Sequence, residues 1–411
     1  MNDVPNPRRD LLLLYAARAA RNFGDGFAVI LLPAYLSAIG YEPAQIGLVA
    51  TAALAGAALF TLTVGYLAPR FDLRSLLLAG AVLMAATGLA MPNARHLVLI
   101  MAVAFVGTMN MATGDLGMLV PIEHAMLARE AADEERTKVF ARYSLIGTFA
   151  SAAGALAAAT PDFLRLVGFG ALPALQAMLY LYAALGLAGA ACYRLLPRLK
   201  SDPNARTSAP LGPSRGIVYK LAALFSIDAF AGGFVVQSLM ALWLFERFGM
   251  SLSAASVFFF WSSVFSALSF PAAARLAARF GLVNTMVFTH IPSSICLIVA
   301  AFVPNLYGVL ALLLVRSALS QMDVPTRTSY VMAVVTPAER PAAASVTAVP
   351  RSLASSVSPA FAGLLLGLPF SGLPLVICGA LKIAYDVALL VSFRHIKPPE
   401  ERARPAIAAA K

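Results

Sequence analysis

Long apolar segments follow one another along nearly the whole chain, and they decide the class of fold. A helix that spans a bilayer needs about 20 predominantly apolar residues. Breaking the sequence at clusters of proline, glycine and charge gives twelve such segments: 11–39, 44–68, 75–92, 97–127, 139–160, 173–196, 217–246, 252–276, 283–303, 307–334, 342–366 and 374–394. Only 12% of the residues are charged, against about 25% in soluble domains. We therefore expect an all-helical membrane protein with twelve transmembrane helices.

Four aspartates lie near the middle of otherwise apolar segments: Asp25, Asp115, Asp228 and Asp323. An ionised carboxylate is costly in lipid and usually faces a water-filled cavity with a partner. Asp25 and Asp228 are 203 residues apart, and Asp115 and Asp323 are 208 apart. The chain is thus predicted to consist of two similar halves around a charged path, an arrangement that is typical of secondary transporters.

A second set of matched residues supports this internal repeat. Arg142 in the fifth segment and Arg351 in the eleventh are 209 residues apart. The stretch between the sixth and seventh segments is rich in proline, serine and charge, which is typical of a flexible linker. The predicted layout is a six-helix bundle over 1–196, a cytoplasmic linker over 197–216, a second six-helix bundle over 217–394 and a cytoplasmic tail over 395–411.

The positions of lysine and arginine in the connections predict the orientation. If the N-terminus lies inside the cell, the inside connections and tails hold twenty of these residues. The outside connections then hold three, which are Arg95, Arg165 and Arg247. Because cytoplasmic loops carry the excess of basic residues, we expect an inner-membrane protein with both termini in the cytoplasm.

The loop after the second segment suggests a family. A six-plus-six layout with a long central linker and a basic loop at this place resembles the major facilitator superfamily. In that family this loop often has the sequence pattern G-x-x-x-D-R-x-G-R-K. Gly65, Arg70 and Arg74 fit the glycine and basic positions. Pro69 stands where the acid is expected and Asp72 where the second glycine is expected. Asp72 is therefore the candidate for the gating role that this acid has in the family.

The resemblance implies that spans 1, 4, 7 and 10 line a central cavity, and the four aspartates fall one on each of these spans. Arg21 and Asp25 are four residues apart, as are Asp323 and Arg327, so each pair shares a helix face and can form an ion pair. Pro325 is expected to kink its helix beside the second pair. The candidate cavity residues are Arg21, Asp25, Asp115, Asp228, Gln321, Asp323 and Arg327. The alternative is that the charge pairs only fix helix packing.

Asp115 and Asp228 have no basic residue four positions away in their own spans. Burial favours the neutral form of a carboxyl group, so these two are the candidate proton carriers. The alternative is that an arginine across the cavity holds either of them ionised. Lys382 and Asp386, four apart in the last span, are predicted to form a structural pair.

Further charged residues lie toward the cytoplasmic ends of the spans. With Asp72, the candidate gate residues are Glu123, Arg142 and Arg351. Acids and arginines there could form salt bridges that close the inner gate and break on opening. The alternative is that their side chains extend to the lipid headgroups.

These patterns predict a monomeric, proton-coupled secondary transporter that moves a small organic solute by alternating access, with export favoured over import. No catalytic set, metal site or cofactor motif is present in the sequence, so an enzyme is not predicted. The net charge of +11 lies in loops and tails rather than on one patch, so nucleic acid is not an expected partner. The alternatives are a uniporter for an organic or inorganic ion, and a membrane scaffold or sensor without transport.

Overall fold

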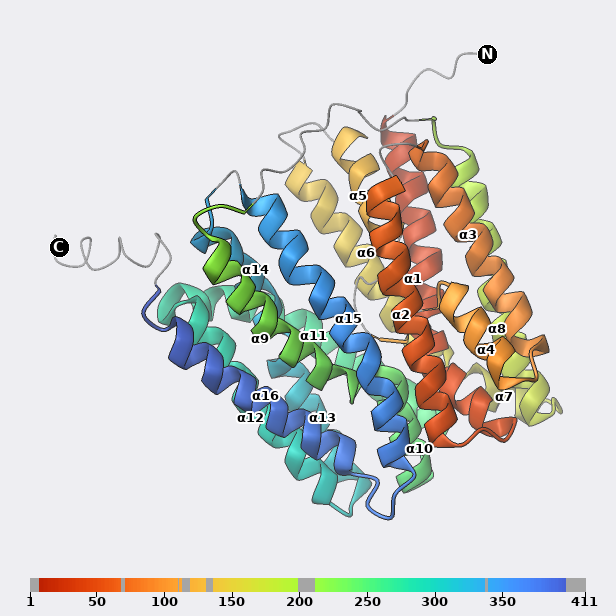
Figure 1. Ribbon diagram of the computed structural model, residues 1–411. Coiled ribbons are helices and arrows are strands. Elements are labelled where there is room, and N and C mark those ends of the chain that lie inside the picture. The colour runs from red at the N-terminus through yellow and green to blue at the C-terminus, as the bar shows by residue number, and fades with distance from the viewer. Residues whose placement is uncertain are drawn as a thin grey trace. The chain divides into compact units, whose positions relative to one another are not determined.

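The computed structural model describes residues 7–67, 71–109, 111–112, 119–130, 136–198, 211–336 and 339–396. These ranges are helical almost throughout (Figure 1). The elements are α1 (Pro7–Ala38), α2 (Pro43–Leu67), α3 (Leu73–Ala90), the 3₁₀ turn η1 (Met91–Asn93), α4 (Leu97–Val106), α5 (Leu119–Glu130), α6 (Arg136–Ala157), α7 (Thr160–Leu166), α8 (Ala171–Arg194), α9 (Arg215–Gly233), α10 (Gln237–Phe248), α11 (Leu252–Phe280), α12 (Leu282–Phe302), α13 (Leu306–Ser320), α14 (Asp323–Val334), α15 (Arg340–Leu366) and α16 (Leu373–Phe393).

The helices follow the twelve expected segments. Within the described ranges, nine helical stretches are long and apolar enough to cross a membrane by themselves. The first segment, α1, falls outside that group and carries Arg18, Arg21 and Asp25 along its length. Three segments are divided in two: the fourth into α4 and α5, the seventh into α9 and α10, and the tenth into α13 and α14.

The break in the tenth segment takes the place of the kink that Pro325 was expected to cause. Helix α13 ends at Ser320, and α14 begins at Asp323, so that Pro325 lies in the first turn, where its missing N–H costs no helical hydrogen bond. The Thr326 hydroxyl donates to the carbonyls of Met322 and Asp323, each at 3.0 Å. Discontinuous helices with free termini at mid-membrane are a recurrent basis of solute sites in transporters.

The chain divides into two compact units. The first unit comprises Met1–Ala205, Val236–Phe260 and Pro359–Gly367, and the second comprises Arg206–Val235, Trp261–Ser358 and Leu368–Lys411. Helix α10 therefore belongs to the first unit, where it packs against α1. The units differ in this respect from the chain-order layout of 1–196 and 217–394.

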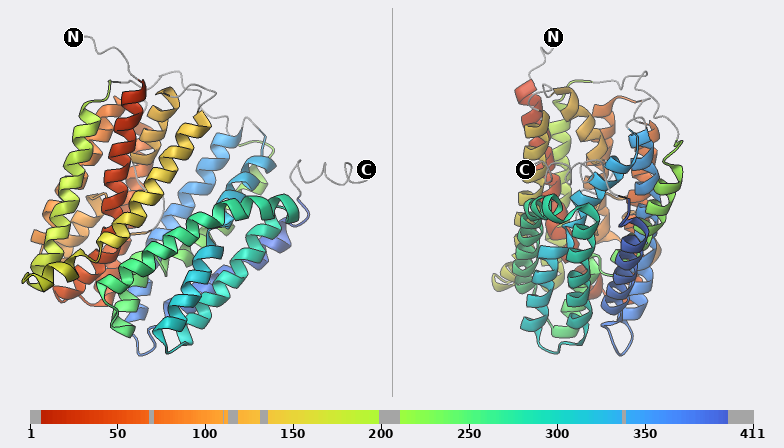
Figure 2. Two further views of the ribbon diagram at one scale, coloured as in Figure 1. Left: turned by 180° about the vertical axis from the view of Figure 1, so that it is seen from behind. Right: turned by 90° about the vertical axis from the view of Figure 1, so that its left-hand side faces the viewer.

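Small residues set the packing of the first unit. Helix α1 packs against α6 and α8 (Figure 2). A Cβ atom added to Gly26 would lie 2.2 Å from the Ser151 carbonyl oxygen, and one added to Gly154 would lie 2.1 Å from the Phe23 carbonyl oxygen. The two backbones are thus in direct contact, as small residues allow between membrane helices.

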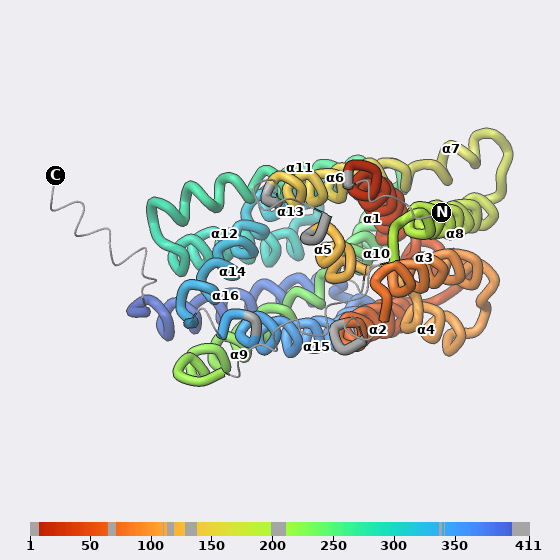
Figure 3. Tube along the Cα trace, turned by 90° about the horizontal axis from the view of Figure 1, so that it is seen from above, coloured from red at the N-terminus to blue at the C-terminus, as the bar shows by residue number. Residues whose placement is uncertain are grey.

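The second unit is built around α12, which packs against α13, α14 and α16, while α16 also packs against α9 (Figure 3). The buried apolar contacts between these helices include Phe225, Val287, Tyr330 and Leu389. Four of these helices, α9, α12, α14 and α16, carry the buried charged residues of the second unit's candidate site.

Candidate functional site

A buried ion pair joins two helices of the first unit. The Arg21 guanidinium on α1 donates to the Glu123 carboxylate on α5, with 2.6 Å between Nη2 and Oε2. Glu123 has no solvent-exposed surface, and the hydroxyls of Tyr143 on α6 and Tyr193 on α8 donate to the same carboxylate. Three helices besides α5 therefore supply hydrogen-bond donors to this one acid.

This pairing differs from the one expected from spacing. In this structure Arg21 pairs with Glu123 rather than with Asp25, and Asp25 accepts a hydrogen bond of 3.0 Å from the Tyr182 hydroxyl on α8. Sharing a helix face permits a pair but does not require one, and the fully buried acid of another helix competes for the guanidinium. The other aspartate expected on this half of the cavity, Asp115, lies outside the described residues.

The candidate gate residues of the first unit occupy three different settings. Glu123 is part of the buried pair with Arg21. Asp72 precedes α3 and caps its N-terminus, because its Oδ2 accepts from the Ser75 backbone N–H at 3.1 Å and from the Ser75 hydroxyl at 2.9 Å. Arg142 is exposed on α6. Within this unit the structure does not bring Arg142 and Glu123 together as a salt bridge.

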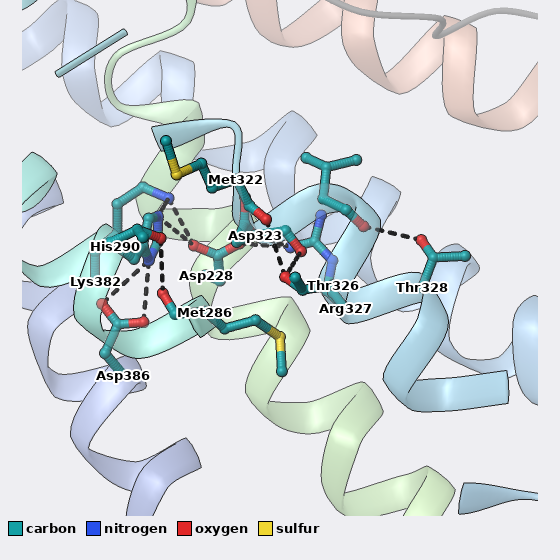
Figure 4. Close-up of polar contacts among 12 residues, drawn as sticks. Asp228, Met286, His290, Met322, Asp323, Thr326, Arg327, Thr328, Lys382 and Asp386 are labelled. Carbon is teal, nitrogen blue, oxygen red and sulfur yellow. Dashed lines mark hydrogen bonds and ion pairs between the residues drawn. The ribbon is translucent and has the colours of Figure 1, made fainter. Parts of the chain in front are cut away.

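The second unit gathers a larger set of charges around Asp228, which is buried on α9 (Figure 4). Lys382 on α16 donates to Asp228 Oδ1 at 2.6 Å, and Arg327 on α14 donates to Asp228 Oδ2 at 3.2 Å. Arg327 also donates to Asp323 Oδ2 at 2.9 Å, so the expected pair four residues apart is present. Gln321 lies at the break between α13 and α14, next to this set.

His290 on α12 connects these charges to Asp386 on α16. Its Nδ1 lies 3.0 and 3.1 Å from the two Asp386 carboxylate oxygens, and its Nε2 lies 3.3 Å from Lys382 Nζ (Figure 4). A lysine ammonium has only donors, so this contact requires Nε2 to act as the acceptor. The arrangement therefore corresponds to a neutral imidazole that carries its proton on Nδ1 and donates it to Asp386.

The predicted pair of Lys382 and Asp386 is replaced by this three-residue arrangement. Lys382 reaches Asp228 and His290, while Asp386 reaches His290. The ring of His290 also packs edge-on against Tyr385, with 6.2 Å between the centroids. We call Asp228, His290, Asp323, Arg327, Lys382 and Asp386 the charge network of the second unit.

Sequence reasoning from spacing missed His290 and misjudged Lys382. His290 is an ionisable residue inside the apolar segment 283–303, and any such residue within a membrane span is a functional candidate. That rule alone would have selected it. Its partners lie 92 and 96 residues away in sequence, so local spacing could not identify them.

Arg351 on α15, expected at the gate, lies near this network without joining it. Its charge interacts with those of Arg327, Asp228 and Asp323. Its Nε atom is buried and has no hydrogen-bond partner in the structure as described.

Among the described residues, no group of three or more histidine, cysteine, aspartate or glutamate side chains could hold a metal ion.

Comparisons with known proteins agree with this architecture. The sequence profile of the Major Facilitator Superfamily matches residues 14–261 and 221–411. The uncharacterized membrane protein YJR124C of Saccharomyces cerevisiae is 25% identical over 425 residues, which cover 94% of each chain. The crystal structure of the nucleoside transporter NupG has a TM-score of 0.74 at 16% identity, covering 93% of this chain and 99% of that one.

A third similar structure is that of the D-xylose–proton symporter, with a TM-score of 0.71 at 16% identity, covering 92% of this chain and 96% of that one. At such identities the likeness establishes the fold alone. The family profile, however, matches both halves of the chain. The chain is therefore a member of the Major Facilitator Superfamily, an all-helical, multi-pass membrane transporter and not an enzyme.

Proposed function

We propose that this protein is a proton-coupled secondary transporter of a small organic solute, and that Asp228 is the centre of coupling. The observation that carries the proposal is the position of Asp228 between two cations that differ in their other partners. Arg327 also holds Asp323, whereas the one other contact of Lys382 among the described residues is with the Nε2 acceptor of His290. Loss of the Asp228 charge therefore affects the two cations unequally.

A proton on Asp228 would remove the charge that holds Lys382 while Arg327 keeps Asp323. Lys382 would then depend on His290, whose tautomer is fixed by Asp386. A ligand shifts a conformational equilibrium only through different interactions in the two states. The release of Lys382 supplies such a difference, since α9, α12 and α16 are held together partly through this side chain.

Asp115 stays a second candidate proton carrier on the sequence alone. The D-xylose–proton symporter has the same fold, which supports proton coupling here. The excess of basic residues in alternate connections supports termini in the cytoplasm. Short connections without a receptor domain support export as the direction.

Uniport is the competing function, and one observation favours it. Lys382 and Arg327 both contact Asp228 directly, and two opposite charges stabilise the ionised carboxylate. If Asp228 stays ionised throughout the cycle, the network is a fixed structural element and no proton moves with the solute.

The test begins with a solute found by thermal-shift screening of the purified protein at two pH values. The protein is then reconstituted into liposomes that contain a pH-sensitive dye, and the solute is added without any imposed gradient. We expect solute movement to change the internal pH, and an imposed pH gradient to concentrate the solute. Solute exchange without a change in internal pH would identify a uniporter.

A further inference from the structure

We propose that the transported solute is an organic anion and that its acidic group binds Arg351 and the Tyr385 hydroxyl in the second unit. This inference rests on the proposed transport function, and it specifies the class of solute. It is based on two buried hydrogen-bond donors that lack acceptors and on the charge balance around them.

The first observation concerns Arg351. Its Nε is buried without a hydrogen-bond partner among the residues that the structure describes. The nearest acids that act on it, Asp228 and Asp323, already accept from Arg327 and Lys382. Arg327 adds a like charge beside it. Arg351 is thus attracted to two carboxylates that already pair with other cations.

Tyr385 on α16 supplies the second observation. Its hydroxyl oxygen is buried and likewise has no hydrogen-bond partner in the described ranges, and the residue is only 2% exposed. It interacts electrostatically with Arg351 and with the same two carboxylates. A buried tyrosine hydroxyl normally finds a partner. Two donors in one neighbourhood therefore lack an acceptor.

The charge balance of the second unit points the same way. Its membrane-embedded acids are Asp228, Asp323 and Asp386, and its membrane-embedded cations are Arg316, Arg327, Arg351 and Lys382. With His290 neutral, the cations exceed the acids by one. Protonation of His290 or of any of the acids increases that excess, so this interior stays positive as long as the lysine and the arginines are charged.

A solute anion would remove the deficit of acceptors and of negative charge together. The guanidinium group presents a planar fork of donors that matches a carboxylate or a phosphate, and hydrogen bonds between ions are the strong ones. The Nε donor of Arg351 is buried without a partner among the described residues, and an unmade hydrogen bond at a buried donor is costly, so an acidic group gains from this position. A neutral isostere gains the hydrogen bond but not the charge interaction, and a cation is repelled.

Binding can be tested without knowing the natural solute. The full chain, purified in detergent, is titrated with benzoate, with its neutral isostere benzamide, and with inorganic phosphate at constant ionic strength, and its melting temperature is followed. We expect benzoate and phosphate to raise the melting temperature and benzamide to raise it much less, because benzamide lacks the charge interaction. Arg351→Gln should weaken the apparent affinity for benzoate by about tenfold or more, as expected for the loss of a charge-assisted hydrogen bond.

Two further variants guard against misinterpretation. Tyr385→Phe keeps the ring and removes only the hydroxyl, so it should weaken benzoate binding while the protein stays folded. Arg279→Gln serves as the matched control, because Arg279 is an exposed arginine of the same unit, and its affinity should equal that of the wild type. Adding phosphatidylglycerol to the detergent shows whether a lipid phosphate competes for the same site.

Several results would overturn the inference. Failure of both anions to stabilise the wild type, equal stabilisation by benzamide, or unchanged benzoate affinity in Arg351→Gln would each do so, and a loss in Arg316→Gln alone would move the site elsewhere. If added phosphatidylglycerol abolishes benzoate binding, the site binds a lipid headgroup instead. Proton flux is measured separately, so anion binding without flux rejects the proposed coupling, whereas flux without anion binding rejects only this inference.

Discussion

The two units hold buried acids in opposite ways. In the first unit, Glu123 has one cation, Arg21, and two tyrosine hydroxyls, so a single carboxylate is fully occupied. In the second unit, Asp228 shares its cations with Asp323 and, through His290, with Asp386. The first arrangement resists change, because every alternative leaves a charge unpaired, and the second offers several partners of similar quality.

The residue types account for this difference. Tyrosine hydroxyls ionise only near pH 10, so Tyr143 and Tyr193 act as constant donors to Glu123. A neutral histidine is both a donor and an acceptor, and in the second unit the Nε2 of His290 faces an ammonium group while its Nδ1 faces a carboxylate. The comparison teaches that the two units use their buried acids differently: the first holds one acid in a fixed set of partners, and the second distributes its ionic contacts over several side chains.

The largest expected effect is on stability in the first unit. Arg21→Met leaves the buried Glu123 charge uncompensated, which costs about 3–5 kcal/mol in comparable cases. Lys382→Met should cost less, because Asp228 keeps Arg327. Folded yield and melting temperature in detergent measure both variants.

The double variant Arg21→Met with Glu123→Leu provides the control for this prediction. It removes both charges together, so it should recover part of the stability that Arg21→Met loses. A double variant that instead loses as much stability as Arg21→Met and Glu123→Leu lose separately, added together, would contradict the contrast between the buried pair of Arg21 and Glu123 and the charge network of the second unit. A Lys382→Met variant as unstable as Arg21→Met would contradict it as well.

A smaller effect is expected from the packing of α1 against α6. Gly154→Ala places a methyl group where the Phe23 carbonyl lies 2.1 Å away, and such overpacking costs about 1–3 kcal/mol. Gly189→Ala is the control, since a Cβ there meets no atom within 4 Å and alanine favours the helix. Melting temperatures should fall for Gly154→Ala and stay level or rise for Gly189→Ala; equal shifts would show that the close contact between α1 and α6 is dispensable.

The smallest effect concerns Glu339, which precedes α15 outside the spans. Its carboxylate accepts from the backbone N–H groups of Gly212 and Ser214 and from the hydroxyls of Ser214 and Thr336. The hydroxyls of Thr336 and Ser214, followed by the two backbone groups, lower the pKa of Glu339 from 4.5 to about 2. A carboxyl group whose pKa is lowered in the folded state stabilises the protein at pH values above its ordinary, unfolded-state pKa.

That stabilisation should be complete above about pH 5 and decline as the pH falls through 4.5 toward 2. The melting temperature of Glu339→Gln should therefore lie below that of the wild type at pH 7, and the difference should shrink toward pH 3. A difference that is independent of pH would mean that the carboxylate charge contributes nothing at this connection.

Local sequence patterns predicted what depends on one helix. Apolar length gave the spans, and spacing by four residues gave the pair of Asp323 and Arg327. Pairs between helices escaped, because Arg21 and Glu123 are 102 residues apart and His290 and Asp386 are 96 apart. Such contacts arise from helix packing, which depends on features such as the close approach at Gly26 and Gly154 rather than on the spacing of charges.

Transport by the Asp228→Asn variant tests the central claim most directly. Asparagine keeps the shape and hydrogen-bonding capacity of the side chain but cannot ionise, and Arg327 keeps Asp323 in this variant. In proteoliposomes we predict that Asp228→Asn abolishes accumulation of the solute driven by a pH gradient, while exchange of solute across the membrane without a gradient survives. Accumulation against the solute gradient with unchanged pH dependence would contradict the account, and coupling would then have to be sought at Asp115, Asp25, Asp323 or Glu123, or be given up in favour of uniport.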